Sequence, residues 1–88
     1  MAYIISEHAA SEMERRQVFR EQVLETLERP QQRVATGGGR EVFQSRYFDW
    51  IENKELLLRV VTESKNGDVF VITVYKTSRI GKYWMEAL

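Results

Sequence analysis

The chain has 88 residues, which is enough for one domain, so we expect residues 1–88 to fold as a single unit. Hydrophobic residues make up 43% of the chain and charged residues 30%, a balance typical of globular proteins that argues against disorder. Thirteen basic and thirteen acidic side chains cancel, so the chain lacks the strong positive charge of most nucleic-acid-binding domains. The absence of cysteine and the single histidine exclude disulfides, thiolate metal sites and multi-histidine metal sites. We therefore expect neither a metal nor a cofactor.

The N-terminal residues do not combine a basic segment with a long apolar stretch, as a secretory signal would. No apolar run approaches the roughly 20 residues that a membrane-spanning helix needs. We therefore expect a cytoplasmic bacterial protein with no membrane partner.

Two amphipathic helices are expected in the N-terminal third. Ser6 is a suitable N-cap for a helix over residues 7–16, because its hydroxyl can accept a hydrogen bond from a free backbone N–H. Apolar residues at helical spacing indicate a second helix: Phe19, Val23, Leu24 and Leu27. Pro30 ends this helix, because proline disfavours helical geometry in the residue before it.

After Pro30 the pattern changes to that of strands. We expect a short edge strand over 32–36, a strand over 40–50, and two strands rich in branched residues over 56–62 and 69–77. The Asn66-Gly67 pair between the last two strands favours a tight hairpin. Residues 78–88 are expected to form a short helix or a tail across the sheet. The predicted fold is α+β, with two N-terminal helices packed on one face of a three- to four-stranded antiparallel sheet.

Alternation separates the two faces of this hairpin. The face expected beneath the helices is entirely apolar and contains Leu56, Leu58, Val60, Phe70, Ile72 and Val74. The opposite face is mixed and contains Leu57, Arg59, Val61, Val69, Val71, Thr73 and Tyr75. A face of this composition suits either contact with water or the floor of a binding site.

Several segments together resemble a known family. They are His8-Ala9 with Met13 and Arg16 in one helix, the segment from Val23 to Pro30, and the strand Val71-Ile72-Thr73-Val74-Tyr75. In order and spacing, over roughly residues 5–76, they resemble the bacterial domain of unknown function 4258. That family is similar in its α-α-β-sheet layout to the RelE and BrnT group of small ribonuclease toxins, whose partners are antitoxin proteins. The resemblance implies a compact, RelE-toxin-like domain that cleaves RNA, with RNA and an antitoxin as partners.

Metal-independent RNA cleavage needs proton transfer at the 2′-hydroxyl and the leaving oxygen, and stabilisation of negative charge at phosphorus. Histidine suits the proton transfers and arginine suits the phosphate. We therefore take His8, Arg16, Arg59 and Tyr75 as the candidate catalytic residues, with His8 as acid or base and Tyr75 orienting the substrate. His8 could instead cap or pack, and Arg16 could instead pair with Glu12 four residues earlier.

Arg59 lies among apolar neighbours in a strand, where a charge is costly unless it faces water or a partner. Its alternative role is a cross-strand pair whose aliphatic stem covers the sheet. The tail mixes cations with aromatic residues, as surfaces that bind single-stranded nucleic acid do. The candidate RNA-binding residues are Arg46, Thr73, Lys76, Arg79, Lys82 and Tyr83.

A second function remains open from the sequence. The Tyr83-Trp84 pair and the aromatic residues of segment 46–50 could anchor a protein partner or a second copy of the chain. The domain would then be a non-catalytic interaction module or a homodimer. The balanced charge of the chain favours this alternative.

Overall fold

The computed structural model describes residues 3–86. Its elements in chain order are β1 (Tyr3–Ile5), α1 (Glu7–Arg15), α2 (Arg20–Glu28), β2 (Gln32–Gly37), β3 (Arg40–Asp49), β4 (Lys54–Lys65), β5 (Asp68–Thr77) and α3 (Ile80–Tyr83). The strands form one five-stranded sheet in the order β1-β5-β4-β3-β2. β1 runs parallel to β5, and the other neighbouring strands are antiparallel.

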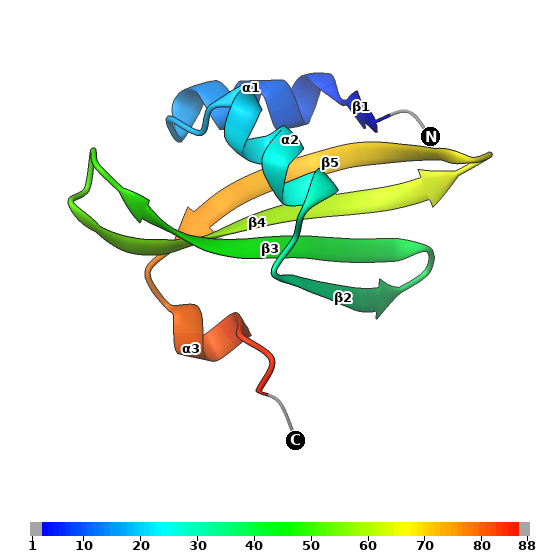
Figure 1. Ribbon diagram of the computed structural model, residues 1–88. Coiled ribbons are helices and arrows are strands. Elements are labelled where there is room, and N and C mark those ends of the chain that lie inside the picture. The colour runs from blue at the N-terminus through cyan, green and yellow to red at the C-terminus, as the bar shows by residue number, and fades with distance from the viewer. Residues whose placement is uncertain (1–2, 87–88) are drawn as a thin grey trace.

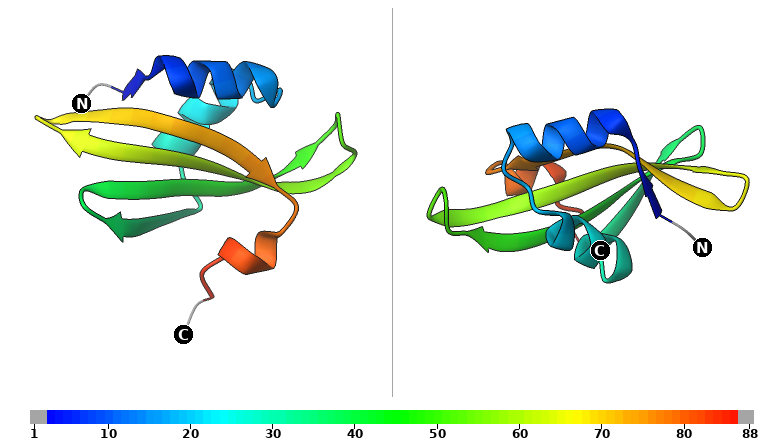
Figure 2. Two further views of the ribbon diagram at one scale, coloured as in Figure 1. Left: turned by 180° about the vertical axis from the view of Figure 1, so that it is seen from behind. Right: turned by 90° about the horizontal axis from the view of Figure 1, so that it is seen from above.

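The sheet separates two layers of helix. α1 and α2 lie on one face, whereas α3 lies on the other face and follows β5 directly (Figure 1). The view from behind and the view from above show the same separation (Figure 2). We call the face that carries α3 the open face, because α3 covers only one end of it.

The predicted arrangement of two N-terminal helices on a three- to four-stranded antiparallel sheet is wrong. The sheet has five strands and is mixed, because β1 precedes both helices and pairs with β5 in parallel. β1 has only three residues, too few to show an alternating pattern, so no periodicity in the sequence predicts it. The molecule is nevertheless an α+β fold built of one sheet and short helices.

Both N-terminal helices begin at identifiable caps. The Ser6 hydroxyl accepts a hydrogen bond from the backbone N–H of Ala9 at 3.0 Å, as the sequence indicates. At α2 the side-chain oxygen of Gln22 accepts a hydrogen bond from the backbone N–H of Phe19, also at 3.0 Å. α2 ends at Glu28, two residues before Pro30.

The β4–β5 hairpin closes at the predicted turn, where Asn66 and Gly67 have φ angles of 54° and 83°. A β-bulge further along changes the faces of β5. Val61 pairs with Thr73 and Thr62 pairs with Val71, so Ile72 is an extra residue in β5.

Because of the bulge, the residues of β5 that lie in the core differ from those expected. Val71 lies in the core beneath the helices, where the alternation placed Ile72. The buried core cluster joins both N-terminal helices to the sheet and consists of Ala9, Met13, Val18, Val23, Leu27, Phe43, Leu58, Val60, Val71 and Val74. Within residues 3–86, no helix has the length and apolar character required to cross a membrane.

Candidate nucleic-acid interface

Arg59 lies at the centre of the open face, between residues of both neighbouring strands. Gln44 of β3 and Tyr75 of β5 are its direct register partners. Its Nε donates a hydrogen bond to Gln44 Oε1 at 2.9 Å, and its Nη1 donates to the Tyr75 hydroxyl. Its guanidinium also lies 4.1 Å from the centre of the Tyr83 ring of α3. The expected cross-strand pairing is therefore present, and it holds the cation in a fixed position.

One terminal nitrogen of Arg59 remains available. The hydrogen bonds of this side chain use Nε and Nη1. Among residues 3–86, no side-chain nitrogen or oxygen is both buried and without a partner. Nη2 is therefore not fully buried and has no hydrogen-bond partner among the described residues, so it is the nitrogen from which Arg59 can donate to an anionic oxygen such as that of a phosphate.

Two glutamines behind Arg59 attach the C-terminal segment to the sheet. Gln44, which is fully buried, donates from Nε2 to Gln32 Oε1 at 2.8 Å and to the Tyr83 carbonyl at 3.1 Å. Gln32 in turn donates to the Met85 carbonyl at 2.6 Å and accepts from the Met85 N–H at 2.9 Å. These amides position both Arg59 and the Tyr83 ring. Sequence reasoning missed them, although an isolated glutamine inside a strand of apolar residues is a usable signal.

The other predicted cations of the open face lie at its edge. The Arg46 guanidinium is 4.8 Å from the centre of the Trp84 ring, and its Nε is 4.0 Å from Glu55. Lys82 lies on α3, with its Nζ 5.2 Å from the Tyr83 ring centre. Arg79 is exposed just before α3. Together with Arg59 they form a group of cations interleaved with aromatic rings.

Thr73, which follows the bulge residue Ile72, lies on the open face. Thr73 pairs with Val61 of β4 and is half-buried. It lies two residues before Tyr75 on the same strand, so the two side chains share a face.

Lys76 does not belong to this face. It follows Tyr75 in the strand, so its side chain points to the opposite side of the sheet, where only 9% of it is exposed. Its Nζ donates a hydrogen bond to Asp49 Oδ2 at 3.0 Å and lies 3.6 Å from Glu52. Lys76 is therefore a buried ion-pair partner on the helix side and does not contribute to the open face.

His8 and Arg16 lie on the helix side of the sheet, at either end of α1. His8 is exposed in the first turn of α1, and Arg16 follows the last turn. The Arg16 Nε lies 2.8 Å from Glu12, which matches the ion pair considered as its alternative role. The sheet therefore separates these two residues from Arg59 and Tyr75, and the four do not form one catalytic centre.

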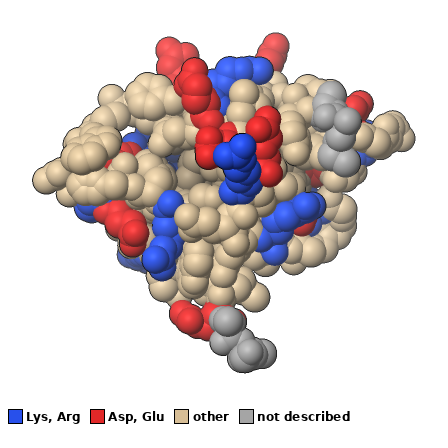
Figure 3. Space-filling view, viewed as in Figure 1, with Lys and Arg blue, Asp and Glu red and all other residues tan. Residues whose placement is uncertain are grey.

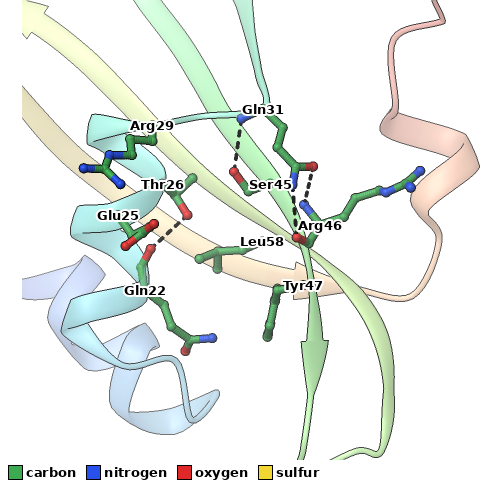
Figure 4. Close-up of a pocket in the computed structure, with 9 residues that line it drawn as sticks. All are labelled: Gln22, Glu25, Thr26, Arg29, Gln31, Ser45, Arg46, Tyr47 and Leu58. Carbon is green, nitrogen blue, oxygen red and sulfur yellow. Dashed lines mark hydrogen bonds between the residues drawn. The ribbon is translucent and has the colours of Figure 1, made fainter.

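A cleft of about 260 Å³ lies on the helix side, between α2 and β3. It is lined by Gln22, Glu25 and Thr26 of α2, by Arg29 just after this helix, and by Leu58 of β4 (Figure 4). The Arg46 side chain points away from this cleft, toward α3. Gln31 spans the cleft's edge through hydrogen bonds to Ser45 and to the backbone of Arg46. These contacts satisfy backbone groups of β3 and of the segment before β2.

The open face thus combines a fixed arginine, a tyrosine hydroxyl and aromatic rings, of which Tyr75 and Tyr83 meet edge to face. Such a group can bind a phosphate through the guanidinium and stack a base on an aromatic side chain. Among residues 3–86, no three histidine or carboxylate side chains gather in a way that could hold a metal ion.

Among known proteins, the chain matches one family model. No curated protein and no solved structure matches the chain. The family model for the domain of unknown function 4258 (DUF4258) matches residues 5–76, which is most of the chain and includes Arg59 and Tyr75. The chain therefore belongs to the DUF4258 family.

Proposed function

We propose that this chain is a toxin-like endoribonuclease, similar to the RelE and BrnT group, that binds single-stranded RNA on the open face of its sheet. The observation that carries the proposal is the fixed Arg59 guanidinium, which donates to the Tyr75 hydroxyl and whose Nη2 has no hydrogen-bond partner among the described residues. An antitoxin protein is the partner that the family likeness suggests.

In this proposal the RNA 2′-oxygen loses its proton to water and attacks the adjacent phosphorus. The bond from phosphorus to the 5′-oxygen breaks, which leaves a 2′,3′-cyclic phosphate and a 5′-hydroxyl. Arg59 stabilises the extra negative charge on the phosphate oxygens, and Tyr75 gives its proton to the departing 5′-oxygen. His8 has no part in this mechanism, because it lies on the far side of the sheet.

Cleavage of a 5′-labelled single-stranded RNA in the presence of EDTA tests the proposal. Arg59→Ala should slow cleavage by about 100-fold or more, and Tyr75→Phe by roughly 10- to 100-fold, because each removes a group that acts on the transition state. Arg20→Ala, which removes an exposed arginine of α2 on the other side of the sheet, is the matched control and should cleave normally. His8→Ala should also cleave normally.

Two results would contradict this function. One is a folded wild-type protein that neither cleaves RNA nor arrests growth when its expression is induced. The other is an Arg59→Ala variant that cleaves as fast as the wild type. RNA binding without cleavage would remove the catalytic part of the proposal and keep the interface.

The alternative, an interaction module anchored by the aromatic tail, has less support at the tail itself. Arg59 and Arg46 of the same chain pack over the Tyr83 and Trp84 rings. At most one face of each ring is then free, which is enough to stack a base but small for a protein partner. Support for a protein partner comes instead from the far end of β3.

A further inference from the structure

Four large apolar side chains are exposed together at one end of the sheet. Phe19 comes from the connection between α1 and α2, whereas Phe48, Trp50 and Ile51 come from the end of β3 and the turn after it. Between 43% and 83% of each residue is exposed, and Trp50 is the most exposed of the four. We call these four residues the apolar end. Figure 3 shows uncharged surface where the β3–β4 turn projects. Apolar groups gathered in this way commonly mark an interaction site.

Two neighbouring clefts open into the apolar end. One is about 250 Å³ and the other about 310 Å³, and both are lined by Gln17, Phe19 and Ile51. Pockets for cofactors and drug-sized ligands run from about 300 to 1,000 Å³, so each cleft is at or below the lower limit of that range. Their size suits single apolar side chains of a peptide rather than a small-molecule substrate.

The loops around the clefts are held in place without a partner. Asp49 accepts hydrogen bonds from the backbone N–H groups of Ile51 and Glu52, at 2.8 and 3.0 Å, which fixes the turn that carries Trp50. On the other side, Gln17 takes a left-handed conformation with φ of 56°. Such fixed loops reduce the entropy that a partner must overcome on binding.

The exposed area argues against a second copy of this chain as the occupant. Aromatic side chains present roughly 150–250 Å² each, so the apolar end exposes on the order of 500 Å². A two-fold dimer through this surface would bury about 1,000 Å², less than the roughly 1,200–2,000 Å² of a stable specific interface. A short amphipathic helix docks through a few apolar side chains three or four positions apart, and two small adjacent clefts can receive such side chains.

Charge defines the partner further. The only charged residues that line the two clefts are Asp49 in one and Glu14 in the other. Lys76 neutralises Asp49, and Glu14 has no ion-pair partner among the described residues. A cation on the partner near Glu14 would therefore be favoured, and an acidic group there would be repelled.

We propose that the apolar end docks a short amphipathic helix of another protein, which inserts two large apolar side chains one turn apart and places a basic residue beside Glu14. This inference is independent of RNA cleavage, because the apolar end and the open-face arginine share no residue.

A phage-displayed library of random 14-residue peptides tests the inference. Wild-type protein serves as bait, and the Trp50→Ala variant is used to remove peptides that bind elsewhere. We expect enriched peptides with apolar residues three or four positions apart and a neighbouring lysine or arginine. For a synthetic peptide of that sequence, Trp50→Ala should weaken binding at least tenfold and Glu14→Gln by about two- to fivefold.

Met85→Ala is the matched control, because Met85 is exposed and apolar but lies in the C-terminal segment. It should bind the peptide as the wild type does, and circular dichroism should show that all variants are folded. The inference fails if no peptide is enriched, if the enriched peptides are acidic, or if they bind Trp50→Ala equally well. It also fails if sedimentation shows a stable dimer that Trp50→Ala disrupts, because the occupant would then be a second copy.

Discussion

Asp49 holds together the turn at the end of β3. Its carboxylate accepts hydrogen bonds from the N–H groups of Ile51 and Glu52, from the Tyr47 hydroxyl and from Lys76 Nζ. Burial by itself raises the pKa of the Asp49 carboxyl, but these hydrogen bonds outweigh that effect and lower the pKa to about 2 from its ordinary value of 3.8. Burial and the hydrogen bond to Asp49 raise the pKa of the Tyr47 hydroxyl, which stays protonated.

The lowered pKa of Asp49 predicts a loss of stability in acid. Ionised Asp49 stabilises the fold above about pH 3.8, and the contribution is lost as the pH falls from there through about 2. The difference corresponds to about 2 kcal/mol in the free energy of unfolding. Urea unfolding between pH 2 and 7 should show this loss of stability in the wild type. The Asp49→Asn variant should not show this part of the loss.

At pH 7 the Asp49→Asn substitution should lower the free energy of unfolding by roughly 3 kcal/mol, because Lys76 then keeps only Glu52, at 3.6 Å, as a charged partner. Glu28→Gln, at an exposed position at the end of α2, is the control and should keep the wild-type pH dependence. Parallel pH profiles for the wild type and Asp49→Asn would contradict this account.

At the scale of elements, the C-terminal segment is attached to the sheet mainly through side chains. α3 has one turn, and the amide group of Gln32 exchanges two hydrogen bonds with the backbone of Met85. Gln44 and the two arginine–aromatic contacts add to this attachment. Because few contacts hold the segment, it should open more readily than the strands.

Gln32→Ala is expected to loosen this segment. Removal of the amide costs about 1–2 kcal/mol of local stability, so hydrogen exchange at the Met85 N–H should speed up by roughly 5- to 30-fold. The neighbouring Gln31→Ala variant is the control, since Gln31 bonds to the backbone of Arg46 and not to the tail. Unchanged exchange at Met85 in Gln32→Ala would show that other contacts carry the attachment.

Elements with local signals could be predicted from the sequence. Ser6 as a cap, the second helix with Val23 and Leu27 buried, and the Asn66-Gly67 turn all depend on neighbouring residues, and the structure contains each of them. Phe19, expected on the buried face of that helix, is instead its N-cap and is 58% exposed. β1 and the bulge at Ile72 could not be predicted, because they depend on pairing with distant strands. Bulge geometry is set by the partner strand and leaves no clear mark in the sequence.

The candidate site was predicted in part for the same reason. Arg59 and Tyr75 share a face through simple alternation, and the structure brings them into contact. Lys76 was assigned to the same surface because it begins a basic tail, although alternation from Tyr75 already places it on the other face. The separation of His8 from Arg59 follows from where α1 packs, which no local pattern specifies.

At the scale of the whole molecule, positive and negative side chains are interspersed. The formal net charge is zero, and Figure 3 shows both signs mixed across the face in view. RNA binding would therefore depend on a few local cations rather than on the overall field of the protein. On the open face these include Arg46, Arg59, Arg79 and Lys82.

This small number predicts a moderate salt dependence for RNA binding. Three or four phosphate contacts give a slope of roughly −2 to −3 for the logarithm of affinity against the logarithm of salt concentration. Fluorescence anisotropy with a labelled single-stranded RNA between 50 and 500 mM salt, as approximate limits, measures this slope. Lys82→Ala should reduce its magnitude by about 0.7. A slope near zero would argue against phosphate contacts on the open face.

The bulge in β5 also bears on how this chain tolerates changes of length during evolution. Loss of one residue from a regular strand turns every later side chain to the opposite face. Ile72 is the exception in β5, because it is the extra residue between Val71 in the core and Thr73 on the open face. Relatives that lack a residue at this point could keep both the packed core and the tyrosine beside Arg59. A one-residue gap here in a family alignment would therefore indicate a strand without the bulge, and would not indicate that the site is lost.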